Sequence, residues 1–157
     1  MLKENKPRKL ARKVGGHYAI VASTYNAKYV DSMVAAATKT LRQAGAAEIE
    51  IVRVPGAFEI PIVASALTRR LVPRVSAIIA LGVILRGATT HAQHIGESVT
   101  QALLNLQVHG LIPIVHEVLL LENEQQARER CLDPKRNRGL EAAQTAIEMA
   151  QIMQRLG

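Results

Sequence analysis

An almost uninterrupted run of apolar residues in the middle of the chain places the strongest limit on its fold. It reads Val-Ser-Ala-Ile-Ile-Ala-Leu-Gly-Val-Ile-Leu and spans residues 75–85. A strand that is apolar on both faces is typical of a parallel sheet covered by helices on each side. The run is far shorter than the roughly 20 residues that a membrane-spanning helix needs. It therefore predicts a buried strand inside an α/β domain.

Strand-like and helical segments alternate along the rest of the chain. The strand-like segments cover 17–23, 48–54, 75–85 and 111–121, and the segments with helical spacing of apolar residues cover 27–43, 58–70, 91–109, 122–131 and 140–156. Pro61 is compatible with its helix only in the first turn. Such alternation predicts a mainly parallel four-stranded sheet with right-handed crossovers and helices on both faces. We expect a single-domain, flavodoxin-like three-layer sandwich.

The positive charge of the chain is concentrated at its N-terminus. The formal net charge is +7, and the first 13 of the 157 residues hold six basic residues and one acid. This predicts a basic, solvated arm over 1–15, open to disorder, followed by one α/β domain over 16–157. With no Trp, three Tyr and one Phe, the chain has few platforms for stacking on nucleic-acid bases. We expect no nucleic-acid partner, although the arm leaves a basic nucleic-acid-binding module as an alternative.

Cysteine usage and the N-terminal pattern bear on location and metal binding. The single cysteine, Cys131, rules out an internal disulfide and a cage of several cysteines. The N-terminal cations are not followed by the apolar segment of a signal peptide, so we expect a cytoplasmic protein with no membrane partner. His91 and His94 share a helix face and could bind zinc with residues 116–117. The His-Glu-x-x-His motif is absent, and no metal is expected.

The loops that follow the expected strands carry most of the unusual residues. In doubly wound α/β folds, ligands bind at the carboxyl ends of the strands. The loops at that edge cover 23–26, 55–59, 82–91 and 118–123. Their polar and aromatic side chains therefore predict one binding site rather than scattered surface groups.

The loop Arg-Gly-Ala-Thr-Thr-His over 86–91 leads from the most apolar strand into a helix. Its small residues leave the backbone accessible, and its threonines are good helix caps. Backbone N–H groups at a helix start suit a phosphate, although the loop alone fits a capped helix without a ligand better. Neither a Walker loop nor Gly-x-Gly-x-x-Gly occurs, so classical nucleotide binding is not supported. His91, in the first turn, could transfer protons near neutral pH or could be an exposed helix-terminal histidine.

Side chains in the other loops admit both a binding and a packing interpretation. Tyr25 and Asn26 offer an aromatic face and an amide to a planar heterocycle, or Tyr25 covers the core. Glu59 could hold a polar ligand with backbone support from residues 57–58, or it is a carboxylate favoured by the helix dipole, with Phe58 in the core. Late in the chain lie several cations, most of them expected on a solvated face and one or two able to complete a phosphate site: Arg128, Arg130, Lys135, Arg136 and Arg138.

Three segments together closely resemble the lumazine synthase (6,7-dimethyl-8-ribityllumazine synthase) family. They are Val-Pro-Gly-Ala-Phe-Glu-Ile-Pro over 54–61, Leu-Gly-Val-Ile-Leu-Arg-Gly-Ala-Thr-Thr-His over 81–91, and Asn-Arg-Gly-Leu-Glu-Ala-Ala over 137–143 with Ala-Ile-Glu-Met over 146–149. The resemblance runs from about Tyr18 to the C-terminus. It implies condensation of 5-amino-6-(D-ribitylamino)uracil with 3,4-dihydroxy-2-butanone 4-phosphate, the penultimate step of riboflavin biosynthesis, without a metal or organic cofactor.

The resemblance also implies a role for each matching residue. His91 would transfer protons. The ribitylaminouracil would be held by Tyr25, Asn26, Ala57, Phe58, Glu59, Val83, Ile84, Leu85, His116 and Arg138. The butanone phosphate would be bound by Ala88, Thr89 and Arg130.

The chain departs from the usual pattern of the family at Tyr25, where Phe or Trp is more frequent, and at two further places. His116-Glu117 stands where many members have Phe-Gly, and Asn137-Arg138-Gly139 stands where Asn-Lys-Gly is familiar. The first change makes the charge of the ring at the pyrimidine depend on pH. The second keeps a cation but alters its geometry.

The resemblance further implies an assembly. Members form homopentamers with active sites between subunits, and some extend to decamers or sixty-subunit icosahedral shells. Riboflavin synthase is a candidate partner. The alternative function is a non-catalytic flavin- or lumazine-binding homologue, against which intact His91, Arg130 and Glu59 count.

Overall fold

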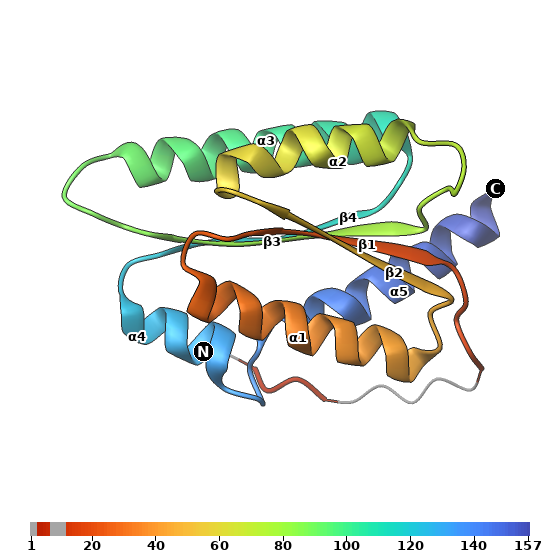
Figure 1. The fold of residues 1–157 in the computed structure, drawn as a ribbon, viewed down its shortest axis with the longest axis horizontal. Helices are drawn as coiled ribbons and strands as arrows, with labels where there is room; N and C mark the ends of the chain where they lie inside the picture. The colour runs from red at the N-terminus through yellow and green to blue at the C-terminus, as the bar shows by residue number, and fades with distance from the viewer. Residues whose placement is uncertain (1–2, 7–11) are drawn as a thin grey trace.

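The computed structural model describes residues 3–6 and 12–157. Strands and helices alternate as expected (Figure 1). In chain order the elements are β1 (His17–Ser23), α1 (Ala27–Ala44), β2 (Glu48–Val54), the 3₁₀ turn η1 (Ala57–Glu59), α2 (Ile60–Arg69), β3 (Ala77–Leu85), α3 (His91–Gly110), β4 (Ile114–Leu121), α4 (Glu124–Ala127), the π-helical turn η2 (Arg128–Leu132) and α5 (Arg138–Leu156).

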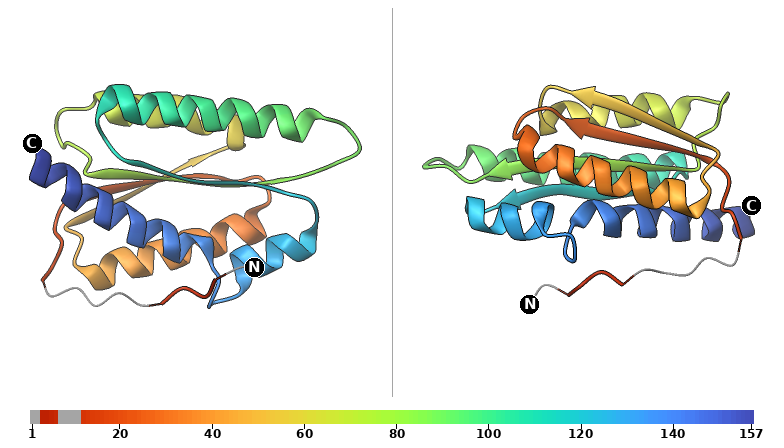
Figure 2. Two further views of the ribbon diagram at one scale, coloured as in Figure 1. Left: turned by 180° about the vertical axis from the view of Figure 1, so that it is seen from behind. Right: turned by 60° about the horizontal axis from the view of Figure 1, so that its bottom comes forward.

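The sheet is parallel throughout, with strand order β2-β1-β3-β4. Helices α2 and α3 cover one face, and α1, α4 and α5 cover the other (Figures 1 and 2). The apolar run is β3, an inner strand whose first seven residues are buried. The prediction of a single α/β domain of the flavodoxin-like three-layer kind is confirmed.

The core consists of one aliphatic layer on each side of the sheet. Successive residues of β3 belong to different layers: Ile79 packs toward Met33 of α1, whereas Ile78 packs toward Val99 of α3. This alternation follows from the period of two along a strand. Because both faces of β1 and β3 are buried, their carboxyl ends are held in fixed relation to each other.

Element boundaries differ from the expected ones where local geometry intervenes. The helix expected over 58–70 begins with η1 and becomes α-helical at Ile60, with Pro61 in its first turn. Strand β4 starts at Ile114 rather than at 111, because Leu111 ends α3 in the left-handed region at φ 53°. The helix expected over 122–131 is α-helical only to Ala127 and then widens into η2.

Parts of the expected N-terminal arm contact the domain. Asn5 donates its backbone N–H to the carbonyl oxygen of Lys135 at 2.7 Å and its side-chain amide to that of Asn137 at 2.8 Å. Val14 donates to the carbonyl oxygen of Ala44 at 2.9 Å. Residues 1–2 and 7–11 lie outside the described residues, so an arm over 1–15 stays a prediction. No helix in the described part of the chain is long and apolar enough to cross a membrane.

Candidate active site

A hollow of about 820 Å³ opens at the carboxyl ends of β1 and β3, between η1 and the start of α3. It gathers residues from three of the four loops that the sequence singled out; the loop over 118–123 does not line it. Ten predicted site residues line it: Tyr25, Asn26, Ala57, Phe58, Glu59, Val83, Ile84, Leu85, Thr89 and His91. Ala88 lies between the lining residues Gly87 and Thr89.

Asn26, which lines this hollow, links the end of β1 to the end of β3 through a hydrogen bond. Its backbone is in the left-handed region at φ 56°, which asparagine tolerates better than most residues. From there its side-chain amide donates a hydrogen bond to the carbonyl oxygen of Val83 at 2.8 Å. This hydrogen bond therefore fixes the β1–α1 loop against the end of β3 within the lining of the hollow.

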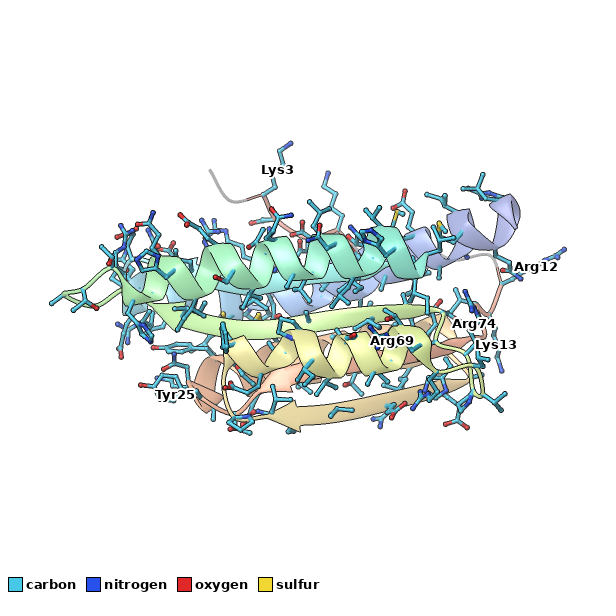
Figure 3. All side chains as sticks on the ribbon, turned by 90° about the horizontal axis from the view of Figure 1, so that it is seen from above. Lys3, Arg12, Lys13, Tyr25, Arg69 and Arg74 are labelled. Carbon is cyan, nitrogen blue, oxygen red and sulfur yellow. The ribbon has the colours of Figure 1, made fainter. Side chains whose placement is uncertain are left out.

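Two aromatic side chains at the hollow are largely exposed. Tyr25 is 73% exposed and Phe58 is 64% exposed. The alternatives in which Phe58 belongs to the core and Tyr25 covers it are therefore wrong. Figure 3 shows Tyr25 at one end of the molecule, near the long β3–α3 connection. Exposed rings beside a hollow are available to a planar ligand or to a second chain.

The start of α3 offers backbone donors to the hollow. Thr90 is the N-cap residue but does not cap the helix with its side chain, and its hydroxyl oxygen lies 3.3 Å from Nε2 of His94. The hydroxyl of Thr89 instead accepts a long hydrogen bond of 3.4 Å from the N–H of His91. His91 is the first residue of this twenty-residue helix, so the positive end of the helix lies beside the hollow.

Several lining residues were missed by sequence reasoning. His94 was considered only as a metal ligand, and Ile95 and Ser98 only as parts of a helix. They lie one and two turns after His91, so the helical period could have identified them. The other missed residues are Gly56, Gly87 and Ala92.

Three predicted site residues, His116, Arg130 and Arg138, do not line the hollow. They come from β4, the edge strand, and from the elements that follow it. Within one chain the predicted site is thus divided into the hollow and a second set of residues, which we call the β4-edge group.

His116 faces α3 and is held as a neutral ring. Its Nδ1 accepts a hydrogen bond of 3.0 Å from the N–H of Val118, and its Nε2 lies 2.7 Å from the hydroxyl oxygen of Thr100. Because that hydroxyl donates to the carbonyl oxygen of Gly96 at 2.7 Å, Nε2 must carry the proton. Burial also lowers the pKa of His116.

Arg138 lies on the other face of β4, in contact with a buried carboxylate. Its Nε and Nη2 donate to Oε2 and Oε1 of Glu117, each at 3.1 Å. Its Nη1 donates to Oε2 of Glu141 at 2.8 Å. Glu117 is only 7% exposed, and this burial raises its pKa while Arg138 opposes the shift.

Arg130 lies in η2, which is anchored to α1 and α5 through its neighbour. The carbonyl oxygen of Cys131 accepts hydrogen bonds of 2.7 Å from the hydroxyl of Ser32 and from the side-chain amide of Asn137. The positive charge of Arg130 slightly opposes the rise in the pKa of Glu117 that burial causes. The Cys131 thiol is buried, which raises its pKa to about 12 and makes it a poor nucleophile.

Another hollow, of about 810 Å³, lies between α1 and α5. It is lined by helix side chains such as Thr40, Gln144 and Arg155 and by Pro134 and Asn137 from the segment that leads into α5. It lacks the histidines, the helix start and the loop backbone that surround the hollow at β1 and β3. Among the described residues no group of three or more His, Cys, Asp and Glu could hold a metal ion.

An open parallel sheet with a histidine, a carboxylate and a helix start around a hollow at its strand ends is the framework of an α/β enzyme for small molecules. The family model described as 6,7-dimethyl-8-ribityllumazine synthase matches residues 15–154. The chain belongs to this family and is a transferase of riboflavin biosynthesis.

Individual relatives match over nearly their full length. A 6,7-dimethyl-8-ribityllumazine synthase of Xylella fastidiosa (strain 9a5c) is 37% identical over 147 residues, or 92% of this chain and 94% of that protein. One from Stenotrophomonas maltophilia (strain R551-3) is 36% identical over 141 residues, covering 88% and 90%. One from Xanthomonas euvesicatoria pv. vesicatoria (strain 85-10) is 35% identical, covering 92% and 94%.

Proposed function

We propose that the hollow at β1 and β3 is one part of the active site in which 5-amino-6-(D-ribitylamino)uracil condenses with 3,4-dihydroxy-2-butanone 4-phosphate. The observation that carries this proposal is the convergence of ten motif residues on one hollow. A flavin-binding homologue without activity would need the ring contacts, but it would not need a histidine beside a phosphate-binding helix start.

The substrates take different parts of the hollow. Tyr25, Asn26 and the end of β3, over 83–85, contact the pyrimidine, and η1 with Glu59 holds the ribityl side of that substrate. The backbone of Ala88 and Thr89 at the α3 start binds the phosphate, because partial positive charge gathers there.

His91 is the proton-transfer residue of the proposed mechanism. The amine of the pyrimidine adds to the ketone, a Schiff base forms, phosphate is eliminated, and the ring closes with loss of water. Each step moves a proton, and His91 lines the same hollow as Thr89 and the end of β3. No step needs a redox cofactor.

The β4-edge group completes the site from a neighbouring subunit. A hollow on one side of the chain and its complement on another make a heterologous interface, which closes into a ring when the rotation between subunits allows it. Arg130 then reaches the phosphate, and His116 and Arg138 reach the pyrimidine. A homopentamer is the proposed ring, located in the cytoplasm. Decamers, sixty-subunit shells and riboflavin synthase as a partner remain predictions.

Subunit mixing tests both the activity and the shared site. Purified wild-type protein is incubated with the two substrates while lumazine absorbance and phosphate release are followed. Variants Glu59→Gln and Arg130→Ala, which are each expected to weaken substrate binding, are then assayed alone and after dissociation and reassembly as an equal mixture, with both substrates well below their wild-type KM so that altered sites turn over slowly. About a quarter of the sites in a randomly mixed ring pair two unaltered halves, so the mixture should regain about a quarter of the wild-type rate. Absence of turnover by the wild-type protein would contradict the proposed activity. A mixture no more active than its components would contradict a site shared between subunits.

A further inference from the structure

The buried carboxylate of Glu117 has no role in the site described so far. We propose that Glu117 is a positioning residue for the pyrimidine substrate, which orients the guanidinium of Arg138 toward the pyrimidine held by the neighbouring subunit. This inference rests on the proposed function, since it deepens the role given there to Arg138.

The contact is a two-pronged clamp rather than a single ion pair. Glu117 engages Nε and Nη2 of Arg138 together, and Glu141 engages Nη1. An arginine has five N–H donors in one plane, so Nη1 and Nη2 each keep one N–H that these bonds do not use. The side chain of Arg138 is 27% exposed. A carbonyl oxygen of a planar ring is a suitable acceptor for donors held in a plane.

The backbone that carries Arg138 is fixed on both sides. Asn137 is 5% exposed and accepts a hydrogen bond of 2.8 Å from the N–H of Gly139. Gly139 lies so close to α1 that a Cβ there would overlap the carbonyl group of Met33. The remaining conformational freedom at this position is that of the Arg138 side chain, and its hydrogen bonds to Glu117 and Glu141 restrict it.

Two residues that depart from the usual family pattern, Glu117 and Arg138, are partners in this one contact. Glu117 stands where glycine is frequent, and Arg138 stands where lysine is familiar. A lysine ammonium could not form a fork with the carboxylate. A glycine at 117 would provide no partner for an arginine. The clamp therefore holds the cation at position 138 by a two-pronged contact that a lysine at this position could not form.

A purely structural role explains the clamp less well. Replacing a buried ion pair with apolar residues is often neutral or stabilising, so stability alone is a weak reason for such a pair. The pair Glu50–Arg70 on the opposite edge strand, β2, is also two-pronged, through Nη1 and Nη2 of the arginine at 3.1 and 2.7 Å. It lies among no residues of the proposed site and serves as the control.

The test is Glu117→Gln in the full-length assembled protein, with steady-state kinetics for each substrate. The amide nitrogen would face a guanidinium N–H, so the fork breaks. Hydrogen bonds to charged groups are strong enough that KM for the ribitylaminouracil should rise about tenfold. KM for the butanone phosphate and kcat should change less than about twofold. The control Glu50→Gln should lower Tm without changing either KM.

A double-mutant cycle separates positioning from simple destabilisation. Arg138→Gln alone should raise KM for the pyrimidine, and Glu117→Gln should add nothing further in that background. The double variant also removes both buried charges, so it should remain folded if Glu117→Gln alone does not. An unchanged pyrimidine KM in Glu117→Gln, or equal rises for both substrates, overturns the inference. If Arg138→Gln leaves the pyrimidine KM unchanged, the proposed role of Arg138 fails instead.

Discussion

Single side chains carry the phosphate specificity proposed for this site. Apart from backbone donors at the α3 start, Arg130 is the cation assigned to the butanone phosphate. Its neighbour Arg128 is paired with Glu124 at 3.8 Å on the surface of the same segment. The two arginines therefore differ in role although they are two residues apart.

Arg130→Ala should raise KM for the butanone phosphate by about 10- to 100-fold, because a charge-assisted contact to the phosphate is lost. KM for the ribitylaminouracil should stay within about twofold. Steady-state kinetics with one substrate varied at a time measures both constants. Arg128→Ala is the matched control and should change neither. Equal effects of Arg130→Ala on the two substrates would contradict the phosphate assignment.

At the scale of elements, the turn η2 links the outer helices to the site. Its Cys131 carbonyl oxygen accepts from both α1 and the residue that caps α5. A π-helical turn widens the backbone, and here the carbonyl is bound by side chains from outside the turn. The placement of Arg130 thus depends on Asn137 nearby and on Ser32, which is 99 residues from Cys131 in the sequence.

Removing one of these bonds should loosen Arg130 without removing it. Ser32→Ala should raise KM for the butanone phosphate about threefold, since Asn137 still holds the same carbonyl and a neutral hydrogen bond contributes modestly. Thr40→Ala deletes a hydroxyl that bonds only within α1, to Ala36 at 2.8 Å, and is the control. An unaltered phosphate KM in Ser32→Ala, together with the same loss of Tm in both variants, would show that Ser32 serves packing alone.

Sequence periodicity predicted the strands, the helices and the loops of the hollow because these depend on local spacing. The alternating pattern of 48–54 and the apolar run of 75–85 each became a strand with nearly the expected limits. The Glu117–Arg138 clamp could not be predicted in this way. Its partners are 21 residues apart, and their meeting depends on how α5 packs against β4. The change from α4 to η2 was also missed; the carbonyl oxygen of Cys131 in η2 is bound by side chains from α1 and the α5 cap.

At the scale of the whole molecule, part of the positive charge lies far from the hollow. Figure 3 shows Arg12, Lys13 and Arg74 at the end opposite Tyr25. Exposed charges act weakly beyond about 10 Å at ordinary ionic strength. These three cations therefore contribute little to phosphate recognition, which we assign to the local groups at α3 and η2.

The stability of the whole molecule should depend on pH through the ion pair at that basic end. The hydrogen bond from Arg70 lowers the pKa of Glu50 from 4.5 to about 2. A lowered carboxyl pKa stabilises the fold above pH 4.5, and the contribution is lost as pH falls toward 2. Glu50→Gln should lose about 1–2 kcal/mol at neutral pH, a figure reduced for the partial exposure of the pair. Thermal melts from pH 7 to pH 2 should show the two Tm values converging at low pH. A gap that is independent of pH would contradict this origin.

The contact between Gly139 and α1 has a consequence for any ring built from this chain. Because a Cβ at 139 would overlap the carbonyl group of Met33, the close approach of α5 to α1 requires glycine there. In the proposed ring, the position of α5 would help to set the rotation from one subunit to the next, and small errors in that rotation would add up around the ring. Enlarging residue 139 would therefore disturb closure of the ring as well as the helix packing, and an open or irregular oligomer would result.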